Sequence, residues 1–204
     1  MATLLDFALC SVADVKETLG IDSGDNSKNN IIIRKINQGT EMIEKYTDRR
    51  FASTVYTEEE YDSTNTDQLV LKQRPIITFT SLEVRDSTLN ESDWETVDTE
   101  LYFVDYSAGV LDLVFNVSGR WNRVRTTYTA GYATIPSDIA EACVTLASYL
   151  VENPTSGAAI KRKEEGQRKV EYYDTQSTSN SLFDQLGIDD ILKSYSNYPL
   201  NPDK

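Results

Sequence analysis

The stretch YTAGYATIPSDIAEACVTLASYL, residues 128–150, carries the most regular pattern in the chain. A strand rich in tyrosine and threonine ends at Gly131, where the backbone is expected to need an angle that other residues avoid. A helix is predicted to begin at Pro136 and Ser137, because proline suits a first turn and Asp138 interacts favourably with the helix dipole. Its apolar residues recur at helical spacing and form one wide stripe: Ile139, Ala142, Cys143, Leu146, Ala147 and Leu150. The stretch therefore predicts a strand–turn–helix join with no catalytic residue in it.

Two more helices are predicted upstream of this stretch. The first begins at Ser11, whose hydroxyl can cap the backbone while Asp14 completes a capping box, and it ends at Gly20. The second spans about residues 27–46 and has an apolar stripe at helical spacing: Ile32, Ile36, Thr40, Ile43 and Thr47. The polar segment before it has some features of a calcium loop, but Ile33 stands where a bidentate glutamate is needed. We expect a solvated loop there.

Residues 51–129 have the short apolar runs that are typical of strands. The runs are at residues 51–61, 69–72, 81–86, 101–105, 110–115 and 124–132. Because they are joined locally, they predict an antiparallel sheet or a small barrel. The expected fold class is α+β: a helical bundle of residues 1–50 and 130–204, which includes a C-terminal arm, with an antiparallel β-rich insertion at residues 51–129.

The C-terminal part is polar and has three pieces. A basic group stands out in an otherwise acidic chain: Lys161, Arg162, Lys163, Arg168 and Lys169. This group is either a solvated loop mixed with acids or a contact for an acidic protein surface or a DNA phosphate. A last amphipathic helix is predicted at residues 183–195. The end of the chain is either disordered or a candidate docking tail: Tyr195, Tyr198, Pro199 and Leu200.

Composition limits the possible partners of the protein. The 204 residues carry a net charge of -13 with a pI of about 4.4, so tight DNA binding through counterion release is not expected. The two cysteines, Cys10 and Cys143, stand in no motif and are expected to be buried, reduced thiols. The N-terminal MATLLDFALC has no basic region and is interrupted by Asp6, so no signal peptide is expected. No apolar run is long enough to span a membrane, and synthesis in a reducing cytoplasm is expected.

The sequence also lacks the residues that several kinds of active site require. There is no histidine, which excludes Ser–His and Cys–His nucleophile pairs and zinc sites with imidazole ligands. The glycine-rich nucleotide-binding motifs are absent. The densest acidic group, Glu58, Glu59, Glu60 and Asp62, is expected to lie on a solvated strand, with neighbours on opposite faces, and not to form a catalytic pair. No catalytic residue, no cofactor and no metal ligand is predicted.

The order of the elements resembles that of the head–tail connector proteins, also called adaptor or neck proteins, of long-tailed bacteriophages. The matching segments are residues 13–21, residues 43–51, residues 166–172 and residues 186–195, in the expected order. The most specific part is the motif within the opening stretch: Tyr128, Ala130, Gly131, Tyr132, Ile135, Pro136, Asp138 and Ile139. The β-rich insertion is longer than in compact members of the family, and the resemblance assigns it no role.

The resemblance implies a structural, non-enzymatic protein that forms an oligomeric ring, usually dodecameric, in the neck of the virion. The implied partners are the portal protein, a tail-side neck or stopper protein, and other copies of the chain. An acidic surface of the portal would be the protein surface that the basic group contacts. DNA would pass through the channel of the ring without specific binding, and no membrane would be involved. The protein would be made in the bacterial host cytoplasm, where a free subunit can be a monomer.

Two other classes remain open from the sequence. A β-rich module of a phage tail that binds carbohydrate or a host surface would use Trp94, Trp121 and tyrosines to stack on sugars. A carboxylate-based hydrolase would need two acids that face one cleft.

Overall fold

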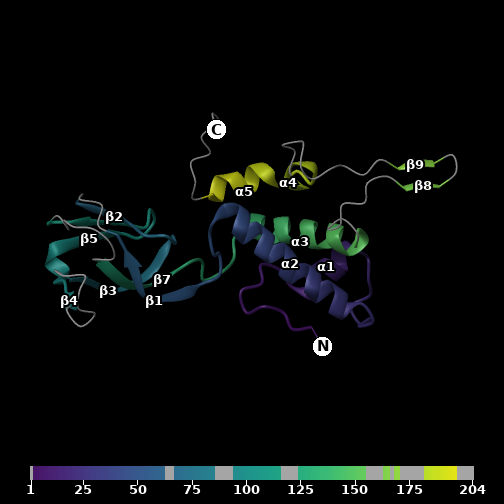
Figure 1. Ribbon diagram of the computed structural model, residues 1–204. Helices are drawn as coiled ribbons and strands as arrows, with labels where there is room; N and C mark the ends of the chain where they lie inside the picture. The colour runs from purple at the N-terminus through teal and green to yellow at the C-terminus, as the bar shows by residue number, and fades with distance from the viewer. Residues whose placement is uncertain are drawn as a thin grey trace. The chain divides into compact units, whose positions relative to one another are not determined.

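The computed structural model describes residues 2–62, 67–85, 94–115, 124–154, 163–165, 168–170 and 182–196. It combines helices with antiparallel sheets, so the fold is of the α+β class (Figure 1). The chain divides into two compact units, one of Met1–Asp48 with Pro136–Lys204 and the other of Arg49–Ile135. The first unit contains the α-helices and the second contains two of the sheets.

The helices begin and end close to the residues expected from the sequence. They are α1 (Val12–Thr18), α2 (Asn29–Thr47), α3 (Ser137–Glu152), α4 (Leu182–Gln185) and α5 (Asp189–Tyr195). Ser11 caps α1: its hydroxyl accepts from the backbone N–H of Asp14, and the Asp14 carboxylate accepts from the backbone N–H of Ser11. Gly20 follows α1 with a φ of 64°. The capping box and the glycine stop of the first helix are thus confirmed.

The core of the first unit lies between α2 and α3, which pack side by side (Figure 1). All five residues of the predicted α2 stripe are buried: Ile32, Ile36, Thr40, Ile43 and Thr47. All six residues of the α3 stripe are buried as well, together with Val144 and Ser148. Gly39 brings the two helices close together, because a Cβ at this position would lie 3.6 Å from Cδ2 of Leu146.

The loop between α1 and α2 is organised around a lysine. Nζ of Lys16, a residue only 5% exposed, donates to the carbonyl oxygen of Ser23 at 3.2 Å and to Oδ1 of Asn26 at 3.3 Å. The ammonium group thus occupies the middle of the segment that we compared with a calcium loop. Among the described residues, no group of three or more acids or cysteines could hold a metal ion.

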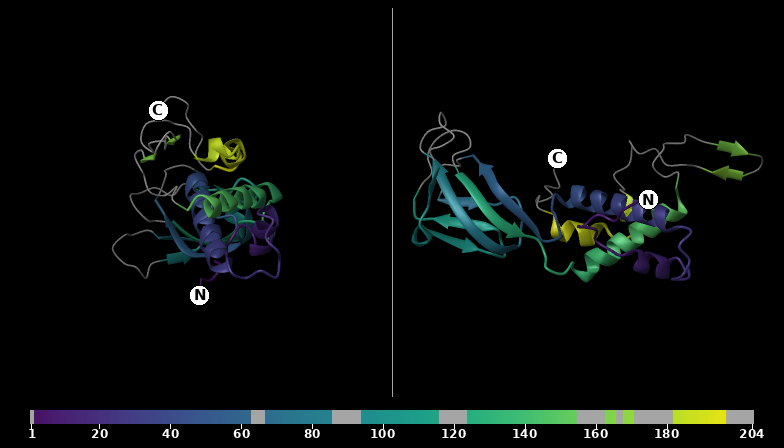
Figure 2. Two further views of the ribbon diagram at one scale, coloured as in Figure 1. Left: turned by 90° about the vertical axis from the view of Figure 1, so that its right-hand side faces the viewer. Right: turned by 90° about the horizontal axis from the view of Figure 1, so that it is seen from below.

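The second unit contains a four-stranded sheet of order β1-β7-β3-β4 and a three-stranded sheet of order β2-β6-β5, both antiparallel (Figure 2). The strands are β1 (Thr54–Tyr61), β2 (Gln68–Val70), β3 (Ile76–Arg85), β4 (Trp94–Thr96), β5 (Tyr102–Asp105), β6 (Val110–Leu113) and β7 (Val124–Ala130), with a 3-10 helix η1 at Thr99–Leu101. The short strand β4 has no counterpart among the predicted runs. The sheets share one core: Tyr61, Leu69, Leu71, Ile76, Leu82, Val97, Leu111, Leu113, Val124, Tyr128 and Ala130.

A bulge in β1 decides which of its residues face this core. Tyr56 stacks on Tyr128 with ring centroids 5.2 Å apart, so Tyr56 faces inward. The register then shifts between Tyr56 and Glu59, and Glu58 has a φ of 52°. An extra residue in one strand reverses the faces of the residues that follow. Glu59 and Tyr61 therefore face inward, and Glu58 and Glu60 are exposed.

The predicted last helix is in fact two short helices. Gly187, with a φ of 70°, separates α4 from α5, and the N–H of Ile188 bonds to the carbonyl oxygen of Phe183 at 2.9 Å as at a helix end. The apolar periodicity of residues 183–195 continues across this break, which is why the pattern indicated one helix. The strands β8 (Lys163–Glu165) and β9 (Arg168–Val170) pair as a two-stranded antiparallel sheet.

Candidate contact surfaces

The first part of the motif closes the second unit where the chain enters and leaves it. The N–H of Gly131 donates to the carbonyl oxygen of Pro75 at 2.9 Å, and the N–H of Tyr132 donates to that of Phe51 at 2.7 Å. The rings of Phe51 and Tyr132 stack with centroids 6.4 Å apart. Phe51 belongs to another segment that carries the resemblance, so two distant parts of the pattern meet here.

Gly131 is required at this join for two reasons. Its φ is 110°, a conformation that L side chains rarely adopt. A Cβ at this position would also lie 2.6 Å from the carbonyl oxygen of Ala52, well inside contact distance. The unusual backbone angle expected from the sequence is confirmed, and the close approach of the Ala52 backbone adds to it.

The second part of the motif begins α3, whose N-cap residue is Pro136. Ile139 is fully buried, and its N–H donates to Oδ1 of Asp138 at 2.9 Å. Both oxygens of Asp138 also accept from the hydroxyl of Tyr195, at 3.1 and 3.0 Å. A residue of the motif is thus joined to the end of α5.

α5 is held at its start as well as at its end. The hydroxyl of Tyr46, near the end of α2, donates to Oδ1 of Asp189 at 2.5 Å. Burial and this hydrogen bond raise the pKa of Tyr46 to about 12. Burial works to raise the pKa of Asp189, but hydrogen bonds from Lys193 and Tyr46 outweigh it and leave that pKa below its usual value. The ring of Phe183 in α4 packs edge-on against Tyr46 at 4.8 Å between centroids.

We call these two contacts, Tyr46 with Asp189 and Asp138 with Tyr195, the α5 clasp. Tyr195, the first residue of the candidate docking tail, is therefore part of the packed helical unit. The remaining candidates of that tail, Tyr198, Pro199 and Leu200, lie outside the described residues.

The structure shows only part of the basic group. Lys161 and Arg162 lie outside the described residues. The backbone of Lys163 pairs with Val170, and Lys169 and Arg168 stand opposite Glu164 and Glu165 in the β8–β9 hairpin. Acidic residues therefore stand opposite two members of the basic group in the register.

The outer side of the three-stranded sheet exposes large apolar side chains. Phe103 is 69% exposed, Val114 74% and Val70 63%, and Leu101 is also exposed. Phe103 and Asp105 share one face of β5. Asp105 and Val70 both stand opposite Val110, so Val70 lies on the same side of the sheet. The N–H of Val114 donates to the carbonyl oxygen of Leu101 at 2.9 Å, which places these two residues together. We call Val70, Leu101, Phe103 and Val114 the apolar sheet face.

A polar cluster lies at the inner side of the β1 bulge. Oε2 of Glu59 accepts from the hydroxyls of Tyr61 at 2.5 Å and Tyr128 at 2.7 Å, and Oε1 lies 3.3 Å from Nζ of Lys72. Burial, together with the hydrogen bond to Glu59, raises the pKa of both tyrosines. Glu59 thus ties β1 to β7 and has its acceptor sites filled by groups that hold it in place.

The neighbouring acids, Glu58 and Glu60, each form an ion pair with an arginine. Oε2 of Glu58 lies 3.3 Å from Nη1 of Arg125, and Oε2 of Glu60 lies 4.0 Å from Nη2 of Arg85. The solvated strand expected for these two acids agrees with their exposure. The sequence did not indicate that Glu59 faces the core. The bulge that turns it inward has its positive φ at Glu58 and not at a glycine, so no residue in the sequence marks the bulge.

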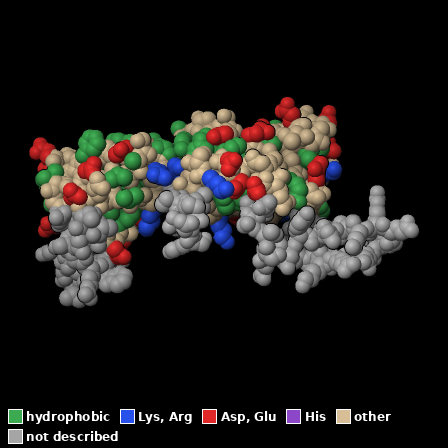
Figure 3. Space-filling model, turned by 90° about the horizontal axis from the view of Figure 1, so that it is seen from above, with side chains coloured by type: hydrophobic (Ala, Val, Ile, Leu, Met, Phe, Trp, Pro, Cys, Tyr) green, Lys and Arg blue, Asp and Glu red, His purple; other side chains and the backbone are tan. Residues whose placement is uncertain are grey.

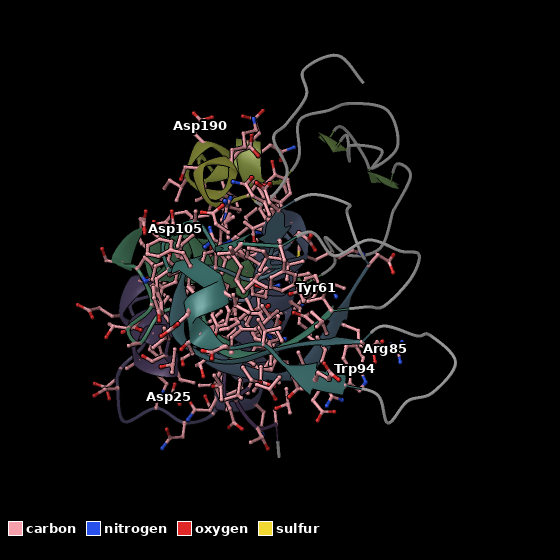
Figure 4. All side chains as sticks on the ribbon, turned by 90° about the vertical axis from the view of Figure 1, so that its left-hand side faces the viewer. Asp25, Tyr61, Arg85, Trp94, Asp105 and Asp190 are labelled. Carbon is pink, nitrogen blue, oxygen red and sulfur yellow. The ribbon has the colours of Figure 1, made fainter. Side chains whose placement is uncertain are left out.

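Trp94 was a candidate for stacking on sugars. The guanidinium groups of Arg85 and Arg125 lie over its ring, 4.5 and 4.6 Å from the centroid. Figure 4 shows Arg85 beside Trp94. Protein cations thus already occupy the aromatic surface that a sugar would need. The other candidate, Trp121, lies outside the described residues.

Acidic side chains are scattered over the surface that Figure 3 shows, with apolar ones between them. Within the described part of the chain, every helix is too short or too polar to cross a bilayer.

Comparison with known proteins gives one family and a group of solved structures. A protein-family model described as "Head completion protein" matches residues 8–179. No curated protein matches the chain.

The matching structures are of gene transfer agent (GTA) particles. One is described as "Virion of native gene transfer agent (GTA) particle", with 16% identity, a TM-score of 0.56, and coverage of 96% of this chain and 93% of that chain. Another is described as "Neck of native GTA particle computed with C12 symmetry", with 15% identity, a TM-score of 0.55 and the same coverage, 96% and 93%. At such identities the likeness shows a common fold over nearly the whole of both chains.

Proposed function

Because this chain belongs to the head completion protein family, we propose that it is a structural component of the neck of a tailed phage particle, where it joins the capsid to the tail. The family match over residues 8–179 carries this proposal. The fold shared with chains of gene transfer agent particles, two of them described as necks, supports it.

In finer detail, the protein acts as one subunit of a ring that lies between the portal and a tail-side neck or stopper protein. Two matching neck structures are named with sixfold and twelvefold symmetry, and a ring of twelve subunits is compatible with both. The helical unit is the bundle of each subunit, and the β-rich unit is an insertion in it. The protein works by contact alone and catalyses no reaction.

The net charge of -13 supports free passage of DNA through such a ring. Acidic groups on a channel wall repel phosphates and provide no counterion release that would hold the DNA in place. This repulsion acts over about 8–10 Å at ordinary salt.

The direct test is to produce particles without the protein. We expect DNA-filled capsids and free tails that do not join, and joining should return when the purified protein is added. Tailed, infectious particles made without the protein would refute the neck function.

The apolar sheet face is the surface that we propose contacts the neighbouring copy in the ring. A ring needs heterologous contacts, in which each subunit offers two different surfaces. Clustered exposed apolar side chains are unfavourable in water and mark protein contacts. Leu101, Phe103 and Val114 lie at one end of the sheet, and Asp112, which stands opposite both Phe103 and Gln68, separates Val70 from them. Among the described residues, Phe103 and Val114 are the two most exposed large apolar side chains.

Phe103→Asp should abolish ring formation on purified portals, as seen by negative-stain imaging. It should leave the free subunit folded, because exposed substitutions change stability by only about 0.5 kcal/mol. Val55→Asp is the matched control, since Val55 is 65% exposed but lies on β1 of the other sheet. Normal rings with Phe103→Asp would exclude this face as the subunit contact.

A further inference from the structure

We propose that Cys10 and Cys143 are a disulfide-forming pair, which stays reduced in the cytoplasm and is oxidised by small-molecule disulfides once the protein leaves the cell. Sγ of Cys10 lies 3.4 Å from Sγ of Cys143, although the residues are 133 positions apart in the sequence. At this distance the two sulfurs are in contact, so an approach of little more than 1 Å would reach the length of an S–S bond.

The surroundings of the pair favour reaction between the two sulfurs over reaction with other groups. Cys143 is fully buried in the middle of α3, whereas Cys10 is 8% exposed in the segment before α1. The thiol of Cys10 donates to the sulfur of Cys143, and Oγ1 of Thr40 lies 3.8 Å from the same sulfur. These hydrogen bonds lower the pKa of Cys143, and the bond to Cys143 with burial raises the pKa of Cys10.

The segment that carries Cys10 is a strap held on α2 by side chains. The backbone N–H groups of Ala2, Leu5 and Leu9 donate to Asn30, Asn37 and Thr40 of that helix. The strap has no regular secondary structure of its own, so these side-chain acceptors and a few buried residues hold it. Local opening of such a segment costs less than global unfolding and would expose Cys10 to a small oxidant.

The chemistry is two successive thiol–disulfide exchanges. Once the strap has opened, Cys10 is in water and away from Cys143, so the two causes that raise its pKa are gone. Its thiolate then attacks a small disulfide RSSR, forms a Cys10–S–S–R bond, and releases RS⁻, which takes up the proton that Cys10 lost. The Cys143 sulfur then attacks Cys10 Sγ, breaks the bond to R, and releases a second RS⁻, which takes up the Cys143 proton. In sum, two protein thiols are oxidised to one disulfide, and one RSSR is reduced to two RSH.

The bond would join the strap covalently to α3 and enclose the whole β-rich unit in one loop. A link that closes so long a loop removes much conformational freedom from the unfolded chain. The cytoplasm keeps such pairs reduced, and the medium outside the cell does not. The bond would therefore stabilise the subunit after the protein has left the cell, where a damaged copy cannot be replaced by new synthesis. The pairing itself depends only on the two sulfurs, whereas its timing, after release from the cell, rests on the proposed neck function.

The test uses the full chain, purified in reductant, freed of it, and incubated folded with oxidised glutathione. We expect the intact mass to fall by two hydrogens, with Cys10- and Cys143-containing peptides joined in a non-reducing digest. The thermal midpoint should rise by about 10 °C and return when reductant is added.

Cys10→Ser and Cys143→Ser are the matched controls. Neither variant should lose two hydrogens or gain the thermal shift, and Cys10→Ser should not form a stable glutathione adduct, because Cys143 is buried. Two thiols that persist in the folded chain under oxidant, a stable mixed disulfide, or disulfide-linked dimers would each overturn the proposal. None of these outcomes would affect the test of the neck function, which measures joining of heads and tails.

Discussion

At the scale of single residues, the join between strand β7 and helix α3 depends on a glycine. Gly131 combines a φ of 110° with the Ala52 carbonyl oxygen 2.6 Å from where a Cβ would lie. Since the obstructing atom belongs to the backbone, no side-chain rearrangement can relieve the contact. The join would have to shift as a whole, and Phe51 with Tyr132 would shift with it.

Gly131→Ala should cost about 3 kcal/mol or more, as the sum of backbone strain and this contact. Gly187→Ala is the control, because Gly187 has a φ of 70° but nothing lies within 4 Å of its Cβ position. It should cost only about 1–2 kcal/mol. Urea denaturation of both variants measures the difference. Equal losses would mean that strain alone matters at Gly131.

At the scale of elements, α2 and α3 form the packed centre of the helical unit. Leu146 is fully buried between them, and Leu146→Ala should cost about 2–5 kcal/mol in the free energy of unfolding. A loss below about 0.5 kcal/mol, the size of a surface effect, would show that this helix is not in the core.

At Gly39 in α2, a substitution by alanine is expected to raise the free energy of unfolding instead of lowering it. A Cβ there would lie 3.6 Å from Leu146 and 3.9 Å from the Ala147 nitrogen, which are ordinary contact distances. Gly39→Ala should therefore keep the packing and stabilise the protein by up to about 1 kcal/mol through helix propensity. Gly39→Leu should instead destabilise it by about 1–3 kcal/mol through overpacking. Both variants are tested by the midpoint of denaturant unfolding, provided that the dependence of the free energy on denaturant concentration stays the same. If Gly39→Ala destabilises the protein, the space between the helices cannot accept one methyl group.

The α5 clasp makes the stability of the helical unit depend on pH. The pKa of Tyr46 is raised to about 12, compared with about 10 in an unfolded chain. Its contribution is therefore complete below about pH 10 and is lost as the pH rises toward 12. The pKa of Asp189 is lowered, so its contribution is present above about pH 4 and is lost in acid.

Urea titrations at about pH 9, 10 and 11 should show a falling free energy of unfolding, and Tyr46→Phe should reduce the fall. The reduction will be partial, because burial also raises the pKa of Tyr61 and Tyr128. Tyr132→Phe is a suitable control, since Tyr132 lies outside the clasp. An unchanged alkaline slope in Tyr46→Phe would contradict the assigned role of the hydroxyl.

At the scale of the whole molecule, the chain consists of two units with separate cores. The β-rich unit, Arg49–Ile135, lies between α2 and α3 in the sequence and has its own apolar cluster. A unit with its own core and both ends near one another in the sheet is expected to fold by itself. The paired backbone of Phe51 and Tyr132 brings those ends together.

A fragment of residues 49–135 should therefore give a cooperative thermal transition and a strand-type circular dichroism spectrum. Gly131→Ala in the same fragment is the control, and it should lower the midpoint. A fragment that shows no transition would mean that the β-rich unit needs the helices in order to fold.

Much of the structure could be predicted from local pattern. The cap at Ser11, the stop at Gly20 and the stripes of α2 and α3 follow from hydrogen bonds and spacings within a few residues. Strand β7 shows a regular alternation of buried and partly exposed residues, in which Val124, Thr126, Tyr128 and Ala130 are buried. Such features are set by neighbours in the sequence, so reading them requires no knowledge of the fold.

Other features depended on residues that are distant in the sequence. Alternation placed Glu59 on the face opposite Glu58 and Glu60, but it could not show which face is buried. The bulge at Glu58 reversed the faces of β1 relative to Tyr56 and turned Glu59 toward two tyrosines. Nothing in their spacing indicated that Cys10 would contact Cys143, or that Phe103 would stay exposed on its sheet. The sequence by itself determined the elements and their buried stripes, because these arise from short-range periodicity. Only the tertiary structure decided which elements meet, because strand register and helix packing are settled between segments far apart in the chain.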